Sequence, residues 1–205
     1  LEFNGVSTAR LVRAASQAGV KRFIYISTAH VYASPLVSTI TENFFPRNLH
    51  PYATSHLSGE HAVLYANQQS KMQTIVLRLS NAFGAPVDKK INCWNLLAND
   101  LCRQALENKQ LILYNAGNKQ RDFIAMTEVC RIISQFLGDR YKTIEKNIFN
   151  IGTGKSVSLL IMAQMIQKRC NDILEYSPEI IMHSEDSKET ELFYKTEELK
   201  RLGIK

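Results

Sequence analysis

Phe23-Ile24-Tyr25-Ile26 and Thr74-Ile75-Val76-Leu77-Arg78-Leu79 are the two stretches that decide the fold of this chain of 205 residues. Each is a short run of apolar and β-forming residues with almost no polar interruption, which is typical of a strand buried on both faces. Between them, Pro51 opens a helical pattern that continues to about Gln69, and proline is well tolerated in the first turn of a helix. A strand, a helix and a second strand in this order predict an α/β fold with a parallel sheet.

The rest of the pattern extends this architecture. We expect further helices and strands, the helices over residues 4–18, 92–107, 127–137 and about 158–169 and the strands over 111–114, 147–151 and 179–183. Gly19 is placed to end the first helix, and residues 33–50, 80–86 and 115–118 are predicted loops or turns. A right-handed crossover brings the ends of the first two strands to one edge of the sheet, where ligands of open α/β sheets bind.

Composition excludes several classes of protein. The net charge is +6, but Lys and Arg never form a run longer than two, which favours a mildly basic solvated surface over a nucleic-acid face. Four cysteines lie far apart without a C-x-x-C motif, which argues against a zinc site or a disulfide framework: Cys93, Cys102, Cys130 and Cys170. No apolar run approaches ~20 residues and no signal peptide is visible, so we expect a cytoplasmic protein without a membrane partner.

Polar side chains gather where the first strand ends and the next helix begins. Ser27 and Thr28 follow the strand, and Tyr52 and His56 stand four residues apart near the start of the helix. Four residues are slightly more than one helical turn, so the phenol and the imidazole share a face. A hydroxyl, a phenol and a titratable ring at the open edge of a parallel sheet predict a proton-transfer site.

The stretch Gly152-Thr153-Gly154-Lys155-Ser156 ends like a phosphate-binding loop. The preceding glycine of that motif is absent, because Phe149 occupies its position. We therefore interpret this stretch as a turn between a strand and a helix.

Seven blocks in this order and spacing resemble the extended short-chain dehydrogenase/reductase family, specifically the NAD-dependent nucleotide-sugar epimerases and dehydratases. They are Asn4-Gly5-Val6-Ser7-Thr8, the run from Gly19 to Tyr32, Tyr52-x-x-x-His56, the run from Arg78 to Gly84, Arg121-Asp122-Phe123, Asn150-Ile151-Gly152-x-Gly154, and Lys195 to Leu202-Gly203. Each block is weak by itself, but the set covers nearly the whole chain.

This resemblance implies the C-terminal part of a Rossmann-like parallel sheet plus a small substrate-binding lobe. Residues 1–84 and 121–151 would form the partial dinucleotide-binding domain, and residues 85–120 and 152–205 the lobe. It also implies an NAD(P)-dependent epimerase or dehydratase of nucleotide-diphosphate sugars, with NAD favoured over NADP, that works by Tyr-assisted hydride transfer. A nucleotide-sugar reductase, and a non-catalytic dinucleotide-binding sensor or scaffold of the same fold, remain open alternatives.

The resemblance also assigns roles to individual residues. The catalytic residues would be Thr28, Tyr52 and His56; the cofactor-binding residues Asn4, Ser27, Tyr52 and His56; and the substrate-binding residues Thr28, Asn81 and Arg121, with no metal. Tyr52 would take the proton of a sugar hydroxyl that is hydrogen-bonded to Thr28. A guanidinium such as that of Arg121 suits phosphate oxygens, because it can bind two of them side by side.

Two features depart from the family pattern. The sequence has no G-x-x-G-x-x-G turn, which in the family seats the cofactor's pyrophosphate on a helix N-terminus. We therefore expect this chain to be a piece of a longer protein and to be inactive alone. The resemblance also implies a homodimer through the helices at about 4–18 and 52–69.

The second departure is His56, which stands where the family has a lysine. A cation near a phenol lowers the phenol's pKa from ~10, and imidazole, with an ordinary pKa of ~6.5, is mostly neutral at pH 7. Three interpretations remain open. Histidine serves as the ribose ligand with partial charge, the protein is a binding or regulatory relative of low activity, or the register differs and Lys71 or another cation takes over.

Overall fold

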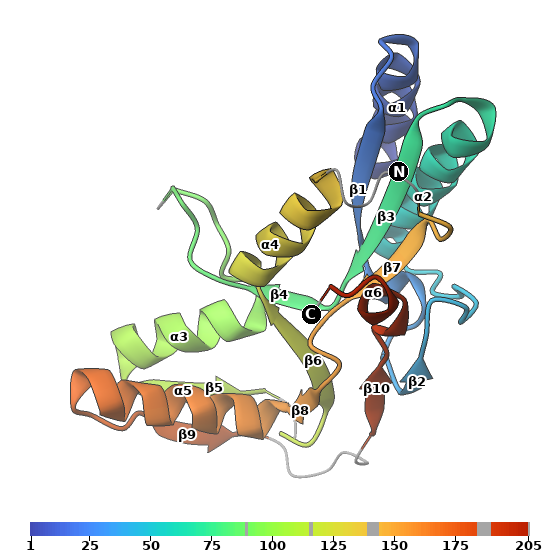
Figure 1. Ribbon diagram of the computed structural model, residues 1–205. Coiled ribbons are helices and arrows are strands. Elements are labelled where there is room, and N and C mark those ends of the chain that lie inside the picture. The colour runs from blue at the N-terminus through green and yellow to red at the C-terminus, as the bar shows by residue number, and fades with distance from the viewer. Residues whose placement is uncertain (89, 115–116, 139–143, 184–189, 205) are drawn as a thin grey trace.

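The computed structural model describes residues 1–205 except 89, 115–116, 139–143, 184–189 and 205. Its central element is a parallel sheet of three strands in the order β1-β3-β7, formed by β1 (Arg22–Thr28), β3 (Gln73–Leu79) and β7 (Ile148–Ile151). Figure 1 shows these strands side by side, with α1 and α2 running along them. The predicted α/β class with a parallel sheet is therefore confirmed.

Helices cover both faces of this sheet, because β3 buries side chains in two directions. Ile75 and Leu77 lie in a cluster with α4 (Met126–Leu137) and α6 (Glu197–Arg201), whereas Val76 packs with the helices of the other face. Those are η1 (Glu2–Ser7), α1 (Thr8–Gln17) and α2 (Pro51–Gln69). A strand that fills two cores needs apolar side chains in both directions, and the run Ile75-Val76-Leu77 of the sequence showed that pattern.

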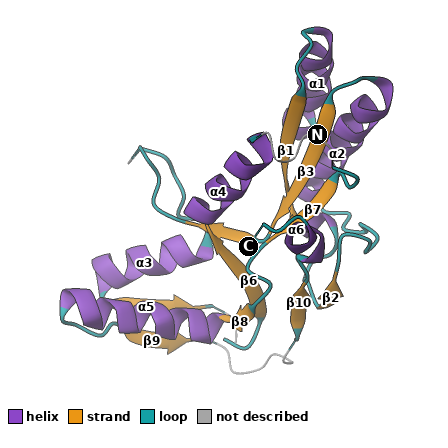
Figure 2. Cartoon of the chain, in the orientation of Figure 1, coloured by secondary structure: helices purple, strands orange, loops and turns teal. Residues whose placement is uncertain are grey.

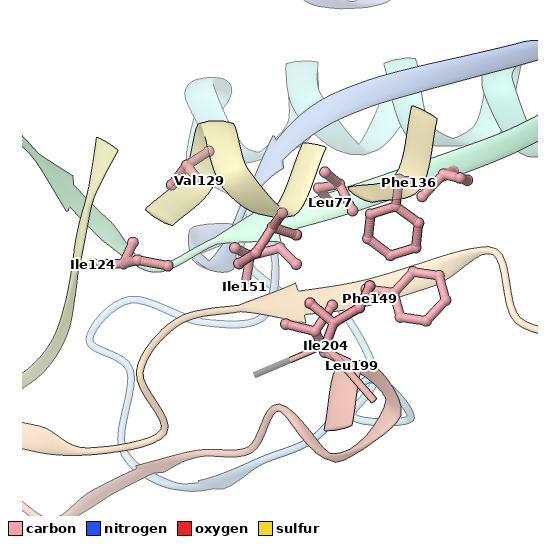
Figure 3. Packing of buried hydrophobic residues seen from close by; sticks show 10 residues of the cluster. Leu77, Ile124, Val129, Phe136, Phe149, Ile151, Leu199 and Ile204 are labelled. Carbon is pink, nitrogen blue, oxygen red and sulfur yellow. The ribbon is translucent and has the colours of Figure 1, made fainter. Parts of the chain in front are cut away.

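The cluster under α4 is held by aromatic and aliphatic side chains from separate parts of the chain. The rings of Phe136 in α4 and Phe149 in β7 lie 5.1 Å apart between centroids. Figure 3 shows them together with Leu199 and Ile204, which come from the C-terminal end of the chain. The C-terminal segment therefore closes the core of the central sheet.

A second group of elements packs below the central sheet in Figure 2. It comprises two small sheets and two helices: β4 (Asn81–Phe83), β6 (Gln120–Ala125) and β8 (Ser156–Ser158); β5 (Gln110–Leu113) and β9 (Glu179–Met182); α3 (Leu97–Asn108) and α5 (Leu159–Leu174). Leu101, Leu111 and Leu159 lie in their shared core. The division into a Rossmann-like part and a lobe stays a prediction. Leu199 and Ile204 belong to the segment 152–205 that was assigned to the lobe, but they pack with the central sheet.

The sequence patterns missed several short strands. Within the predicted loops lie β2 (Ser38–Ile40) and β4, and β6, β8 and β10 (Leu192–Tyr194) were also not predicted as strands. Four of them have three residues and pair with a distant partner, as β2 does with β10, and a run of three residues leaves no periodic signal. β6 has six residues, but its first three are the polar Gln120, Arg121 and Asp122.

The long helices were predicted better than their ends. The helix predicted for 92–107 begins only at Leu97, so the prediction was wrong for residues 92–96. There, the side chain of Asn92 accepts a hydrogen bond from the backbone of Trp94, and Leu96 is extended, with φ −85° and ψ 119°. The helix predicted to end at 169 continues to Leu174. Gly19, with φ 73°, follows the end of α1 as predicted.

Gly59 in α2 lies directly against Tyr25 of β1. A Cβ at this position would lie 2.7 Å from Tyr25 Cζ and closer still to Tyr25 Oη and the backbone oxygen of Asn4. We expect Gly59→Ala to lower the free energy of unfolding by roughly 1–3 kcal/mol, because β1 or α2 must shift. Urea unfolding followed by circular dichroism measures this, with exposed Ser58→Ala in the same helix as the control. Equal midpoints for the two variants would contradict the packing described here.

Candidate active site

A pocket of about 570 Å³ opens where β1 and β3 end, at the edge predicted from the topology. Its wall is built from six parts of the chain: the end of β1, the segment between β1 and α2, the start of α2, the end of β3 with β4, the start of α3 with the residues before it, and β6. Six of the seven predicted site residues line it: Ser27, Thr28, Tyr52, His56, Asn81 and Arg121. The fold therefore brings together side chains that are separated by up to 94 positions in the sequence.

Thr28 and Ser27 end β1 with buried side chains, 7% and 3% exposed. Thr28 Oγ1 accepts a hydrogen bond of 3.2 Å from the backbone N–H of His30, which leaves its own O–H available to the pocket. Ser27 Oγ instead donates to Glu60 Oε1 at 2.5 Å. Of the two hydroxyls, that of Thr28 is the one free to donate to a ligand.

Tyr52 and His56 face each other on α2, as their spacing predicted. Their ring centroids lie 4.7 Å apart in an edge arrangement, and the Tyr52 side chain is 49% exposed to the pocket and solvent. His56 Nδ1 lies 3.5 Å from the hydroxyl of Tyr25. Burial lowers the pKa of His56 below its ordinary value, although the nearby charge of Glu60 acts in the opposite direction. His56 is therefore neutral at pH 7 and supplies no cation to Tyr52.

Lys71 does not take the place of that cation. It lies beyond the C-terminal end of α2 and is not among the residues that line the pocket. A helix of this length separates its two ends by roughly 28 Å. The interpretation in which Lys71 fills the cationic role is therefore wrong.

Arg121, at the start of β6, faces the same pocket with a partly buried guanidinium. Burial lowers its pKa, since no charge of opposite sign compensates for the lost hydration. Its neighbour Asp122 binds the backbone N–H and the hydroxyl of Thr153, at 3.0 Å each. Across the described residues, the Arg121 guanidinium forms no side-chain hydrogen bond or ion pair. A desolvated cation without a counter-ion is suited to an anionic ligand.

Asn81 lies in β4 next to Arg121. Its Nδ2 donates to the backbone oxygen of Asp122 at 2.9 Å, which ties β4 to β6 and leaves Oδ1 as the second polar atom of the amide. Asn4 is the predicted site residue that the fold keeps apart. It is not among the pocket-lining residues, and its Nδ2 donates to Ser55 Oγ at 3.1 Å on the flank of α2.

The sequence analysis did not assign six polar residues of the pocket wall to the site: His30, Ser34, Asn48, His50, Ser80 and Asn95. The pKa of His30 is lowered by burial and by the neighbouring Arg121 and His50. His30 lies in η2 (Ala29–Val31), inside a block that was noted only for its strand and hydroxyls, and Asn48 and His50 fall in a loop whose polar composition is ordinary. Two ordinary signals of a loop, length and polarity, pointed to the segment but not to the side chains.

Beneath the pocket lies an ion pair that the sequence also did not reveal. Glu60 of α2 and Arg78 of β3 bind each other through two guanidinium nitrogens, and their side chains are 0% and 4% exposed. The guanidinium also lies over the ring of Tyr32, 4.6 Å from its centroid. Glu60 of this pair also accepts the hydrogen bond from Ser27 Oγ, so the pair holds in place a residue of the pocket wall.

The turn Gly152–Ser156 follows β7 and leads into β8 and α5, as interpreted from the sequence. Gly154 has φ 72°, and the backbone amide of Thr153 binds the carboxylate of Asp122. In the described part of the chain, no three His, Cys, Asp or Glu side chains are grouped so that they could hold a metal ion. Likewise, no helix of the described residues is long and apolar enough to cross a membrane.

Known proteins with similar sequences come from one family. The family model described as "NAD dependent epimerase/dehydratase family" matches residues 1–152. The dTDP-D-glucose 4,6-dehydratase of Bos taurus is 30% identical over 163 residues, which are 78% of this chain and 43% of that protein. The dTDP-L-rhamnose 4-epimerase of Burkholderia thailandensis is 31% identical over 121 residues, 59% of this chain and 32% of that protein. The chain thus spans less than half the length of these relatives.

Solved structures resemble the chain over nearly its whole length. The UDP-N-acetylglucosamine 4-epimerase of Methanobrevibacter ruminantium has a TM-score of 0.81 at 19% identity and covers 100% of this chain and 63% of its own. The UDP-glucuronic acid 4-epimerase of Bacillus cereus, solved with UDP-glucuronic acid and NAD, has a TM-score of 0.75 at 23% identity, covering 98% and 62%. At such identities the likeness establishes the fold alone.

Proposed function

Because this chain belongs to the NAD-dependent epimerase/dehydratase family, we propose that the full natural protein acts on a nucleotide-diphosphate sugar with NAD as cofactor. The observation that carries this proposal is the convergence of Thr28, Tyr52 and Arg121 on one pocket. A hydroxyl and a phenol supply a proton path, and an unpaired guanidinium supplies a site for a diphosphate.

The residues present fit the nicotinamide end of such a cofactor. The pocket volume of about 570 Å³ is typical of small-molecule sites, and the Tyr52 phenol and His56 imidazole offer polar groups to a ribose. Nicotinamide, when bound, accepts a hydride and returns it. The turn that would hold the pyrophosphate is not in this sequence, so we assign to this chain only the binding of the ribose next to the nicotinamide.

We assign the acid–base work to the chain's own side chains. Thr28 Oγ1 already accepts from the backbone of His30, so its O–H points its hydrogen at a sugar oxygen. Tyr52 takes the proton of the sugar hydroxyl, and Arg121 holds the diphosphate and thereby fixes the sugar in the pocket. Asn81 and Ser27, which line the pocket, keep the roles predicted for them, whereas Asn4 lies outside the pocket wall.

The pocket wall favours an epimerase over a dehydratase. Removal of water from a sugar needs a group that protonates the leaving hydroxyl, in addition to the base. Among the described residues that line the pocket there is no Asp or Glu, and burial lowers the pKa of His30 and His56, which makes these two histidines weak proton donors at pH 7. Epimerisation at one carbon by oxidation and reduction needs only the Tyr52 phenol and the returned hydride.

A second candidate function is a non-catalytic dinucleotide-binding sensor or scaffold. The neutral His56 favours it, because the phenol then lacks the cation that the family pattern supplies. A homodimer through η1, α1 and α2, and a cytoplasmic location, stay predictions.

The deciding experiment offers the full natural protein a panel of nucleoside-diphosphate hexoses, including uronic acids, and follows the absorbance of reduced nicotinamide and the configuration of the product. We expect a product inverted at one carbon without net consumption of NAD. Bound NAD with no reaction across the panel would instead support the sensor.

His56→Lys tests the role of the missing cation. A lysine four residues after Tyr52 adds a charge beside the phenol, which favours the phenolate. We expect kcat at pH 7 to rise about tenfold, the effect of a one-unit fall in the pKa of a phenol. His61→Lys, on the same helix but exposed, is the matched control for added charge. A rate at or below that of the unchanged protein would mean that the enzyme works through the imidazole itself.

A further inference from the structure

A chain of four hydrogen bonds connects the two candidate catalytic residues. The backbone N–H of His30 donates to Thr28 Oγ1 at 3.2 Å, and Asn48 Nδ2 donates to the oxygen of His30 at 2.7 Å. The backbone N–H of His50 donates to Asn48 Oδ1 at 3.0 Å, and that of Tyr52 donates to His50 Nδ1 at 3.2 Å. The chain thus begins at the Thr28 hydroxyl and ends at the backbone of Tyr52, the residue whose phenol must meet the same sugar hydroxyl.

The amide of Asn48 is the bridge between the two halves of the pocket. Its partners are a carbonyl oxygen, which can only accept, and a backbone N–H, which can only donate, so both ends of the amide are used and its orientation is fixed. The neighbouring backbone adds to the contact, because Arg47 and Asn48 donate to the oxygens of Tyr32 and Val31 at 3.1 and 3.3 Å. Asn48 thus joins the end of β1 to the start of α2.

His50 caps the helix at the catalytic tyrosine itself. Pro51 has no N–H, so the first unsatisfied backbone donor of α2 belongs to Tyr52. That donor binds His50 Nδ1 at 3.2 Å, so the imidazole of His50 takes the part of an N-cap side chain.

We propose that Asn48 and His50 are positioning residues that fix the distance between the Thr28 hydroxyl and the Tyr52 phenol. The proposal rests on the proposed function of the pocket. Thr28 and Tyr52 lie on elements that are joined by a long segment, so the covalent chain alone does not set their separation. Errors near 1 Å in such a pair cost as much as 10²-fold in rate.

Four variants of the full natural protein test the positioning role. We expect Asn48→Ala and His50→Ala to lower kcat about tenfold or more and to leave KM for the nucleotide sugar within about twofold. Asparagine is among the best N-cap side chains, so His50→Asn should restore kcat to within about threefold of the unchanged protein. Asn43→Ala in the same segment, whose side chain makes no hydrogen bond within the described residues, is the control.

Amide hydrogen exchange at Tyr52, measured without substrate, tests the cap independently of turnover. We expect exchange at least about tenfold faster in His50→Ala and near the unchanged rate in His50→Asn, even if no nucleotide sugar is turned over. Unchanged exchange in His50→Ala would overturn the proposal. So would a His50→Asn enzyme that keeps the cap but is as slow as His50→Ala, because the imidazole would then act on the substrate directly.

Discussion

Tyr52→Phe is expected to lower kcat of the full natural protein by about 10²- to 10⁴-fold, the usual contribution of a positioned general acid or base. The substitution removes one oxygen from a side chain that is 49% exposed in the pocket. No side-chain hydrogen bond of its hydroxyl joins it to another described residue, so the free energy of unfolding should change by less than about 0.5 kcal/mol. Initial rates and urea unfolding measure the two effects separately.

Tyr65→Phe is the matched control, because it removes the same oxygen from the same helix at a position that is 64% exposed and outside the pocket wall. The dissociation constant of the nucleotide sugar should stay within about threefold in both variants, since Arg121 and not the phenol holds the diphosphate. A Tyr52→Phe enzyme that retained more than a tenth of the original kcat would remove Tyr52 from the acid–base role. The proton would then have to pass through His56 or His30.

Much of the central sheet could be predicted because its signals are local. The centre of β3, Ile75-Val76-Leu77, is apolar on both faces, and α2 starts at a proline. The spacing of Tyr52 and His56 places them on one face of this helix. Since parallel strands end at one edge, the sequence also led to the location of the pocket. Tyr52 and Thr28 could therefore be brought together from pattern alone.

The remaining features depend on contacts between distant segments. β10 and β2 pair over three residues that have no periodicity, and the loop that carries Asn48 and His50 has an ordinary polar composition. That His56 is mostly neutral at pH 7 could be predicted from its residue type, but the further lowering of its pKa comes from burial, which depends on how the surrounding elements pack. Asn4, assigned to the cofactor by resemblance, instead binds Ser55 beside α2.

Glu60→Ala is expected to lower the free energy of unfolding by about 3–5 kcal/mol, because it leaves the Arg78 guanidinium buried without a partner. Both side chains are almost fully shielded from water, with Arg78 Nε 3.0 Å from Glu60 Oε1. The hydroxyl of Ser27 also loses its acceptor. Asp172→Ala is the control, since its pair with Lys168 is exposed and should contribute less than about 1 kcal/mol.

The double variant Glu60→Met with Arg78→Met distinguishes two causes of lost stability. One is the burial of a charge without a partner, and the other is the loss of the attraction between the two charges. Two apolar side chains of similar volume leave no charge to be desolvated, so most of the lost stability should return. The Ser27 hydroxyl would still lack its acceptor, and Thr28 beside it would be held less firmly. Stability should therefore recover while kcat remains low. A double variant as unstable as Glu60→Ala would contradict this account, because the cost would then lie in packing against Tyr32 and not in the unpaired guanidinium.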